Sequence, residues 1–370
     1  GQALSVTNAF TISNSGRTFN SGANNVTVGS LSNNGTFTAP SATATTGLTL
    51  NGDFTNSGTY NANGGTVHIG AAVTVSGTAP TFNNFVVDAA GSFTAPSSFP
   101  LTGSLTNNGS FTTSGTVSFS GNTAKQILGT NKITFNNLTL TGGTNVNDLT
   151  LATTAGADVT GIVTLLAPAN AAVLTINASC PFTLLSTADR PTVDASVAAI
   201  PTGSSISGNV TVQRYMSKIG VAAYNYQVYH DISSPVNTNV ADLQNSLPIT
   251  GNFTGASIVS GVTNSNPGSA AMAWYDETQT GGINTGWTDF PADGTDNTAS
   301  FVKGRGYSLF VFGSDPPVTT NGMAKWSLTG PIWSGTFNLP VTYTNTGSPS
   351  DDGWNLVRNP YPSAIDWKAA

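Results

Sequence analysis

Apolar and polar residues alternate along short segments of the first half of the chain. In Thr66–Ile69, Val67 and Ile69 alternate with Thr66 and His68, and Thr116–Phe119 repeats this order. A period of two is that of a β-strand with one buried face. The segments end after a few residues at Gly, Asn or Ser, which tolerate the conformations of sharp turns. The pattern therefore predicts many short strands joined by tight corners.

Similar sequence segments recur along this region. Phe54–Tyr60 returns 51 residues later as Leu105–Phe111, and Thr81–Val87 returns 53 residues later as Thr134–Leu140. A shorter offset of 23 residues separates Leu31–Phe37 from Phe54–Tyr60. A repeat of about 20–25 residues built from short strands has the size of one turn of a β-solenoid, whose turns bury one another's apolar faces.

Paired asparagines occupy matching places in these repeats: Asn33-Asn34, Asn83-Asn84, Asn107-Asn108 and Asn136-Asn137. If the pairs stack in register, their side-chain amides could form hydrogen-bonded ladders at the corners of the solenoid. The alternative is that they are ordinary turn residues. The sequence leaves both interpretations open.

Composition narrows the class of protein. Charged residues are only 8% of the 370, yet 38% are hydrophobic, which is not a disordered composition. The net charge is −6 and no basic patch exists, which argues against a nucleic-acid partner. The single cysteine, Cys180, excludes an internal disulfide, and no apolar run is long enough to predict a membrane span. The start, Gly1-Gln-Ala-Leu4, fits a chain trimmed by a signal peptidase.

A change in composition divides the chain. All six Trp lie after position 270, and aromatic strands between long polar loops describe an antiparallel β domain. The prediction is an all-β protein: a parallel β-solenoid (β-helix) over residues 1–204, then an antiparallel β-sandwich-like domain over residues 205–370. Within the second domain we expect a hairpin, a central strand and a meander, at 271–275 with 286–290, at 306–312, and at 326–328, 335–339 and 341–343.

Three segments of the second region, 212–215, 303–311 and 353–367, carry a resemblance. Together they resemble the large secreted surface proteins of Bacteroidetes that the type IX secretion system exports. The repeat ending in Phe135–Leu140 is similar to the β-strand repeats upstream in those proteins. Members usually continue into a β-sandwich sorting domain, whereas this chain stops at Ala370, so we expect its second domain to be truncated. The resemblance implies an extracellular location and the type IX export machinery as a partner.

A parallel β-helix can also be a polysaccharide lyase or hydrolase, which needs clustered carboxylates on one face. The acidic residues of the first region do not recur at solenoid spacing, and Asp148 and Asp158 are interpreted as turn formers. His68 is expected to point outward. His230 and Asp231 are neighbours on a predicted strand and therefore face opposite ways. No catalytic residue and no cofactor is predicted.

Two kinds of binding site are candidates in the second region. Asp293 and Asp296 could offer oxygen ligands to Ca²⁺, or could simply form an Asp-Gly turn. Exposed tryptophans could stack on sugar rings, or could pack in the core. These are Trp274, Trp287, Trp333 and Trp354.

The sequence thus predicts a secreted, non-enzymatic cell-surface protein with a structural or adhesive role. Its partners would be surface or extracellular glycans or proteins, and it could self-associate into a fibre through open solenoid ends. The alternative is a carbohydrate-binding or polysaccharide-degrading β-helix protein.

Overall fold

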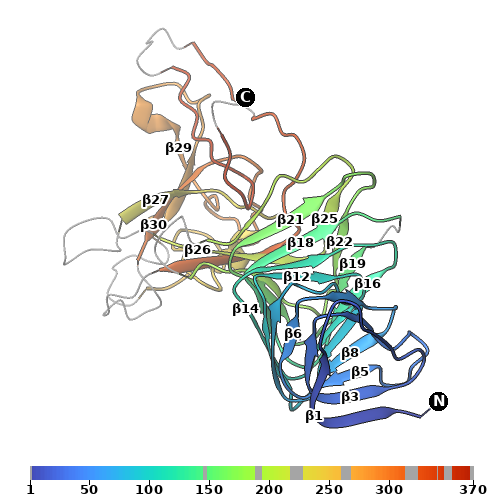
Figure 1. Ribbon diagram of the computed structural model, residues 1–370. Coiled ribbons are helices and arrows are strands. Elements are labelled where there is room, and N and C mark those ends of the chain that lie inside the picture. Colours follow the sequence, from blue (N-terminus) through green and yellow to red (C-terminus); the bar gives the residue numbers. More distant parts are fainter. Residues whose placement is uncertain are drawn as a thin grey trace. The chain divides into compact units, whose positions relative to one another are not determined.

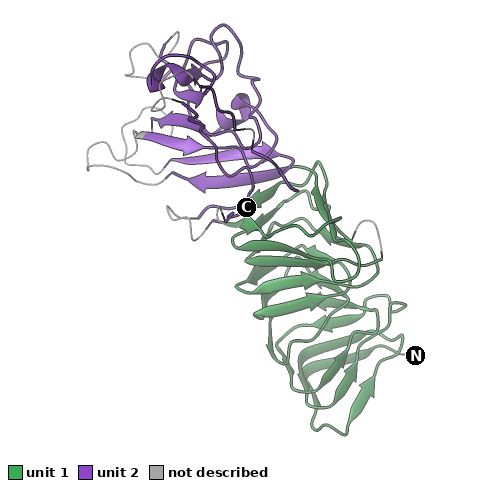
Figure 2. Cartoon of the chain, turned by 90° about the horizontal axis from the view of Figure 1, so that it is seen from above, with its two compact units in different colours: residues 1–183, 195–209 green, residues 184–194, 210–370 purple. Residues whose placement is uncertain are grey.

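The computed structural model describes residues 2–144, 148–187, 194–216, 228–259, 268–312, 324–339, 341–345 and 352–366. The chain forms two compact units, coloured separately in Figure 2. The first unit comprises Gly1–Thr183 and Ala195–Asn209, and the second comprises Leu184–Asp194 and Val210–Ala370.

The first unit is a parallel β-solenoid of about 8 turns, as predicted. The chain passes through three series of short strands in order, and Figure 1 shows neighbouring turns of the coil side by side. The first series is β1 (Leu4–Ile12), β3 (Val26–Asn33), β5 (Leu48–Leu50), β8 (Thr66–Ile69), β10 (Asn84–Val87), β13 (Leu105–Asn107), β16 (Lys125–Leu128), β19 (Leu149–Leu151), β22 (Val173–Ile176) and β25 (Ser205–Ser207).

The other two series complete each turn. The second is β6 (Phe54–Asn56), β9 (Ala72–Gly77), β11 (Ser92–Ala95), β14 (Ser110–Thr113), β17 (Ile133–Phe135), β20 (Ala157–Val159) and β23 (Phe182–Leu184). The third is β2 (Thr18–Asn20), β4 (Thr36–Thr38), β7 (Thr59–Asn61), β12 (Ser98–Leu101), β15 (Thr116–Phe119), β18 (Asn137–Thr141), β21 (Ile162–Leu166) and β24 (Ser196–Val197).

The register between strands pairs residues of the same kind, apolar with apolar and polar with polar, in successive turns of the coil. One inward row on the first series runs through paired, buried residues: Val26, Leu48, Val67, Phe85, Leu105, Ile127, Leu151 and Ile176. The adjacent outward row begins with Thr27, Thr49 and His68. A single short strand cannot bury such a row, but a stack of strands about 4.8 Å apart can.

Aromatic rings form a continuous series inside the coil. Phe37 stacks on Tyr60 with centroids 6.0 Å apart, and Tyr60 contacts Phe82 at 5.2 Å. The series continues from Phe82 to Phe99 at 5.7 Å and from Phe99 to Phe111 at 6.0 Å. Burying a Phe side chain is worth about 1.5–3 kcal/mol, so this series is a main source of stability.

The repeated Phe-Asn-Asn segments join adjacent turns through their side chains. Asn83 Nδ2 donates to the carbonyl oxygen of Gly64, 2.7 Å away, on the preceding turn. Asn84 Oδ1 accepts from the backbone N–H of Ser104 on the following turn, at 2.9 Å. Thr102 Oγ1 also donates to Asn83 Oδ1 at 3.3 Å. The two amides therefore connect three successive turns.

The second copy of the segment makes the same bonds. Asn136 Nδ2 donates to the Ser114 carbonyl oxygen at 2.7 Å, and Asn137 Oδ1 accepts from the Ile162 N–H at 2.9 Å. A Cβ atom at Gly161 would lie 2.4 Å from Asn137 Oδ1, so glycine is required beside the amide. The repeat thus conserves an interaction between turns as well as an apolar pattern.

The amide ladder proposed from the sequence is mostly replaced by these bonds to backbone. Among the described residues of the solenoid, a direct bond between two amides joins Asn33 Nδ2 to Asn56 Oδ1 at 2.9 Å. Asn107 Nδ2 instead donates to the Lys132 carbonyl oxygen at 3.1 Å. The backbone carbonyls of tight turns need donors, and the nearest amides supply them.

The second unit contains antiparallel pairs. A four-stranded sheet has the order β27 (Val228–Ile232), β30 (Tyr307–Val311), β28 (Met272–Tyr275) and β29 (Trp287–Asp289). The predicted hairpin and central strand are therefore confirmed, since β28 pairs with β29 and β30 lies inside the sheet. β26 (Val210–Tyr215) pairs antiparallel with β31 (Lys325–Gly330). The predicted meander is wrong beyond β31, because 335–339 and 341–343 are irregular.

Helix is limited, within the described residues, to α1 (Val240–Leu243) and the 3-10 helix η2 (Ile283–Gly286). No helix in these ranges has the length and apolar character needed to cross a bilayer.

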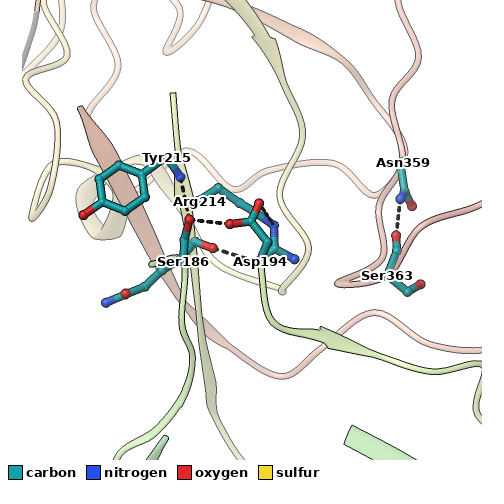
Figure 3. A network of polar contacts seen from close by, with 7 residues as sticks. Ser186, Asp194, Arg214, Tyr215, Asn359 and Ser363 are labelled. Atoms are coloured by element: carbon teal, nitrogen blue, oxygen red, sulfur yellow. Dashed lines mark hydrogen bonds and ion pairs between the residues drawn. The ribbon is translucent and has the colours of Figure 1, made fainter. Parts of the chain in front are cut away.

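A polar network holds the end of β26 within the second unit (Figure 3). Ser186 Oγ donates to the carboxylate of Asp194 and accepts from the Tyr215 N–H at 3.0 Å. Arg214 Nε lies 3.6 Å from Asp194 Oδ2. Burial lowers the pKa of Arg214, and the charge of Asp194 opposes this effect. The network ties Ser186 and Asp194 to the end of β26.

Candidate functional site

Two of the four candidate tryptophans pack against cations. The ring centroid of Trp274 lies 3.8 Å from Cζ of Arg305, a stacking distance for a guanidinium. Trp333 belongs to a set of aromatic rings around Lys303, with its centroid 5.7 Å from Nζ. Both indoles are half-buried. These two residues therefore act in internal packing.

Lys303 sits in an aromatic cage. Its Nζ lies 4.8 Å from the ring centroid of Phe337 and 5.1 Å from that of Tyr361, and it donates to the Ser334 carbonyl oxygen at 3.1 Å. Burial lowers the pKa of Lys303. Each such cation–π contact is worth about 0.5–2 kcal/mol, depending on desolvation. The cage has a structural role, since its own lysine fills it.

The two glycines of the Lys303-Gly-Arg-Gly306 segment allow a second segment to approach. Gly306 N–H donates to the Leu356 carbonyl oxygen at 2.9 Å, and Arg358 N–H donates to the Gly304 carbonyl oxygen at 3.1 Å. A Cβ at Gly306 would lie 2.6 Å from Leu356 Cγ. Segments 303–311 and 353–367, which carried the resemblance, are thus in contact; Trp367 lies outside the described residues.

The other two tryptophans are exposed. Trp287 is 45% exposed and Trp354 is 53% exposed. Trp287 faces Tyr275 across the β28–β29 pair, with ring centroids 5.4 Å apart in an edge-to-face arrangement. Trp287 and Trp354 are therefore the two exposed indoles among the four candidates.

Glu277 holds the segment around Trp354 in place. Its carboxylate accepts from Thr342 Oγ1 at 2.7 Å, from the N–H of Thr344, and from the Gly353 N–H at 3.3 Å. The hydrogen bond from Thr342, with smaller contributions from the other donors, lowers the pKa of Glu277 against the opposing effect of burial. The only glutamate of the chain therefore stabilises a loop junction.

Asp293 and Asp296 lie in the loop after β29. Asp296 Oδ1 accepts from the N–H of Thr298 at 2.8 Å and from its Oγ1 at 2.5 Å, and the hydroxyl bond contributes most to lowering the pKa of Asp296. Asp293 is exposed beside Gly294, whose φ is +73°. Within the described ranges, no three His, Cys, Asp or Glu side chains gather as a metal-binding group. A Ca²⁺ ion here would depend on backbone and water oxygens, and calcium binding stays a prediction.

The ionisable groups singled out in the solenoid are engaged in structural contacts. His68 Nδ1 lies 3.0 Å from Asp88 Oδ1 on the outer surface. Asp148 is buried and accepts from the N–H groups of Gly143 and Val173, 2.9 and 3.0 Å away. Asp158, also buried, pairs with Lys132 at 2.6 Å. Asp148 and Asp158 therefore satisfy buried donors and a cation instead of forming simple turns.

The sequence analysis missed a surface formed by the four-stranded sheet, three of whose strands, β27, β30 and β29, are labelled in Figure 1. Pairing and alternation place eight side chains on one face of this sheet, which we call the aromatic face. They are Tyr229, Asp231, Ala273, Tyr275, Trp287, Asp289, Ser308 and Phe310. The opposite face buries Met272, Tyr307 and Leu309. Alternation within each strand was visible in the sequence, but strand order and register were not.

The chain matches no protein-family model, and comparisons with curated proteins and with solved structures found no significant match.

Proposed function

We propose that this chain is a secreted, non-enzymatic protein of the cell surface with a structural or adhesive role. The solenoid serves as a stiff spacer and the second unit makes the contacts. The observation that carries the proposal is the use of the solenoid's polar side chains: the amides of Asn83, Asn84, Asn136 and Asn137 bond to adjacent turns. A repeat whose recurring polar groups hold adjacent turns together supports a role that depends on shape.

The spacer has a defined length. About 8 turns at the strand spacing of about 4.8 Å give a coil of roughly 40 Å. Stiffness follows from the side-chain bonds between turns and from the continuous series of buried rings. A rigid spacer keeps an attached contact surface at a distance without the entropy cost of ordering a flexible linker.

The proposal also covers the export route of the protein and the fold of its second unit. The segments around Lys303–Gly306 and Leu356–Arg358 resemble those of type IX secretion substrates, and they contact one another. This contact supports the proposal that the second unit is a module of the kind found in those substrates. We expect the four-stranded sheet and the β26–β31 pair to form a sandwich-like domain. Self-association into a fibre belongs to the same proposal, because any end strand of a solenoid that is left unpaired can pair with a strand of a second copy.

An adhesion assay tests the proposal directly. Beads coated with the full chain should adhere to surfaces bearing extracellular polysaccharide or bacterial cells, whereas beads coated with an unrelated acidic protein should not. The same preparation incubated with polysaccharides should release no reducing sugar. Turnover that a single Asp→Asn change abolishes would replace this proposal with an enzyme, and absence of adhesion to every surface would refute the adhesive role.

The alternative of carbohydrate binding has a specific observation in its favour. Trp287 and Tyr229, 45% and 65% exposed, lie on the same face of one sheet, where their rings are open to a ligand. Adhesion and carbohydrate binding are compatible, because a glycan can be the surface to which the protein adheres.

A further inference from the structure

We infer that the aromatic face of the four-stranded sheet binds a glycan chain that lacks acidic groups. Sugar rings would stack on Trp287 and Tyr229, and sugar hydroxyls would donate to Asp231 and Asp289. This inference rests on the adhesive function proposed above and names the ligand class and the residues.

The centre of the aromatic face is a row of four directly paired residues. Asp231 pairs with Ser308, Ser308 pairs with Ala273, and Ala273 pairs with Asp289. The two central side chains are small, and the two outer ones are carboxylates. Three strand spacings of about 4.8 Å separate the carboxylates by roughly 14 Å. The row is therefore a shallow trough with an acceptor group at each end.

Aromatic pairs stand on opposite sides of this trough. Tyr229 and Phe310, directly opposite on β27 and β30, have ring centroids 5.1 Å apart. Tyr275 and Trp287 stand on β28 and β29, on the other side of the row. Each pair lies two residues from the row, which is about 7 Å along a strand. The aromatic pairs occupy diagonal corners of the face, so an extended ligand crossing the trough meets both.

A sugar chain matches this arrangement of groups. Pyranose rings have apolar C–H faces that suit an exposed aromatic ring, and hydroxyl edges that suit carboxylate and hydroxyl acceptors. Among the described residues, neither Asp231 nor Asp289 has its carboxylate engaged by a hydrogen bond or an ion pair. Their acceptor capacity is available to a ligand.

The charge of the face selects against acidic glycans. Asp231 and Asp289 lie on this face. Partial burial raises the pKa of Asp289, and the nearby negative charge of Asp293 raises it further. On the β27 side, Arg358 Nη2 donates to the Asp231 carbonyl oxygen at 2.7 Å. Among the described residues named here, three carboxylates stand against one guanidinium, in a chain of net charge −6, so the face is negative. Uronate or sulfate groups would be repelled.

The test uses the full chain and defined oligosaccharides. Isothermal titration with cellohexaose, xylohexaose and mannohexaose should detect binding to at least one, while hexagalacturonate should not bind. Trp287→Ala and Tyr229→Ala should each weaken binding about tenfold or more, because truncating a central aromatic contact is costly. Trp354→Ala is the matched control: it removes an equally exposed indole outside the aromatic face and should leave affinity unchanged. Unchanged thermal melting of each variant shows that folding is intact.

Several results would overturn the inference. These are binding of none of the neutral hexasaccharides, tighter binding of hexagalacturonate, or equal losses in Trp287→Ala and Trp354→Ala. A Trp287→Ala, Tyr229→Ala double variant whose coated beads still adhere fully would refute the glycan site and leave the adhesive role standing. Hexasaccharide binding by a chain that adheres to no surface would instead refute the adhesive role alone.

Discussion

Replacement of Phe99 by alanine tests whether the solenoid is held by its internal aromatic series. Phe99 is fully buried on β12 and contacts four rings, those of Phe82, Phe85, Phe93 and Phe111, at centroid distances of 5.7, 4.9, 5.2 and 6.0 Å. Truncation of a buried Phe costs about 3–5 kcal/mol, and aromatic pairs add about 0.5–1.5 kcal/mol each beyond burial. With four ring partners, we expect a loss near the upper end, about 4–5 kcal/mol.

The loss should be local, because each turn of a solenoid contacts only its neighbours. Hydrogen exchange followed by mass spectrometry should show faster exchange in β10, β11, β13 and β14, and little change in β22. Urea unfolding measures the total loss of unfolding free energy.

Two control variants define the scale. Phe99→Leu keeps most of the volume and should cost no more than about 1.5 kcal/mol. Ser118→Ala changes an outward residue on β15 and should stay within about 0.5 kcal/mol. A cost for Phe99→Ala no larger than that for Ser118→Ala, or exchange that accelerates equally in every turn, would refute the account of a packed interior.

Three further outcomes are expected. Asn137→Ala removes the acceptor of the exposed Ile162 N–H and should cost about 0.5–1.5 kcal/mol in urea unfolding; no change would contradict the proposed bond between turns. Tyr60→Phe removes a buried hydroxyl that has no partner among the described residues, so it should raise the melting temperature. Glu277 has a lowered pKa, so its contribution is present above the ordinary carboxyl pKa of about 4.3 and is lost as pH falls through the folded value; Glu277→Gln should flatten that part of the stability–pH profile.

The sequence was a good guide to the solenoid because the relevant interactions are short in range. The alternation in Thr66–Ile69 and its repetition at Thr116–Phe119 predicted β8 and β15 with the correct buried residues. The asparagine pairs showed that something recurs at the corners, but not what they bond to. An amide can bond to another amide or to a carbonyl, and the turn geometry selects the carbonyl in most cases here.

The sequence was a poorer guide to the second unit. Four of its tryptophans were candidates for stacking on sugar rings, but Trp274 and Trp333 face cations, whereas Trp287 and Trp354 are exposed. The cation partners, Arg305 and Lys303, are distant from both indoles in sequence. No periodicity reports such pairings, because they depend on how irregular segments cross.

The sequence by itself determined that the first half of this chain is a stack of short strands, since a period of two repeated every 20 or so residues can bury its apolar face only by stacking. Tertiary structure alone decided which side chains share a surface. Tyr229, Trp287 and Phe310 lie far apart in the chain. They share one face because antiparallel pairing brings β27, β30, β28 and β29 into a single sheet. Strand order and register are long-range choices, and the aromatic face exists only once they are made.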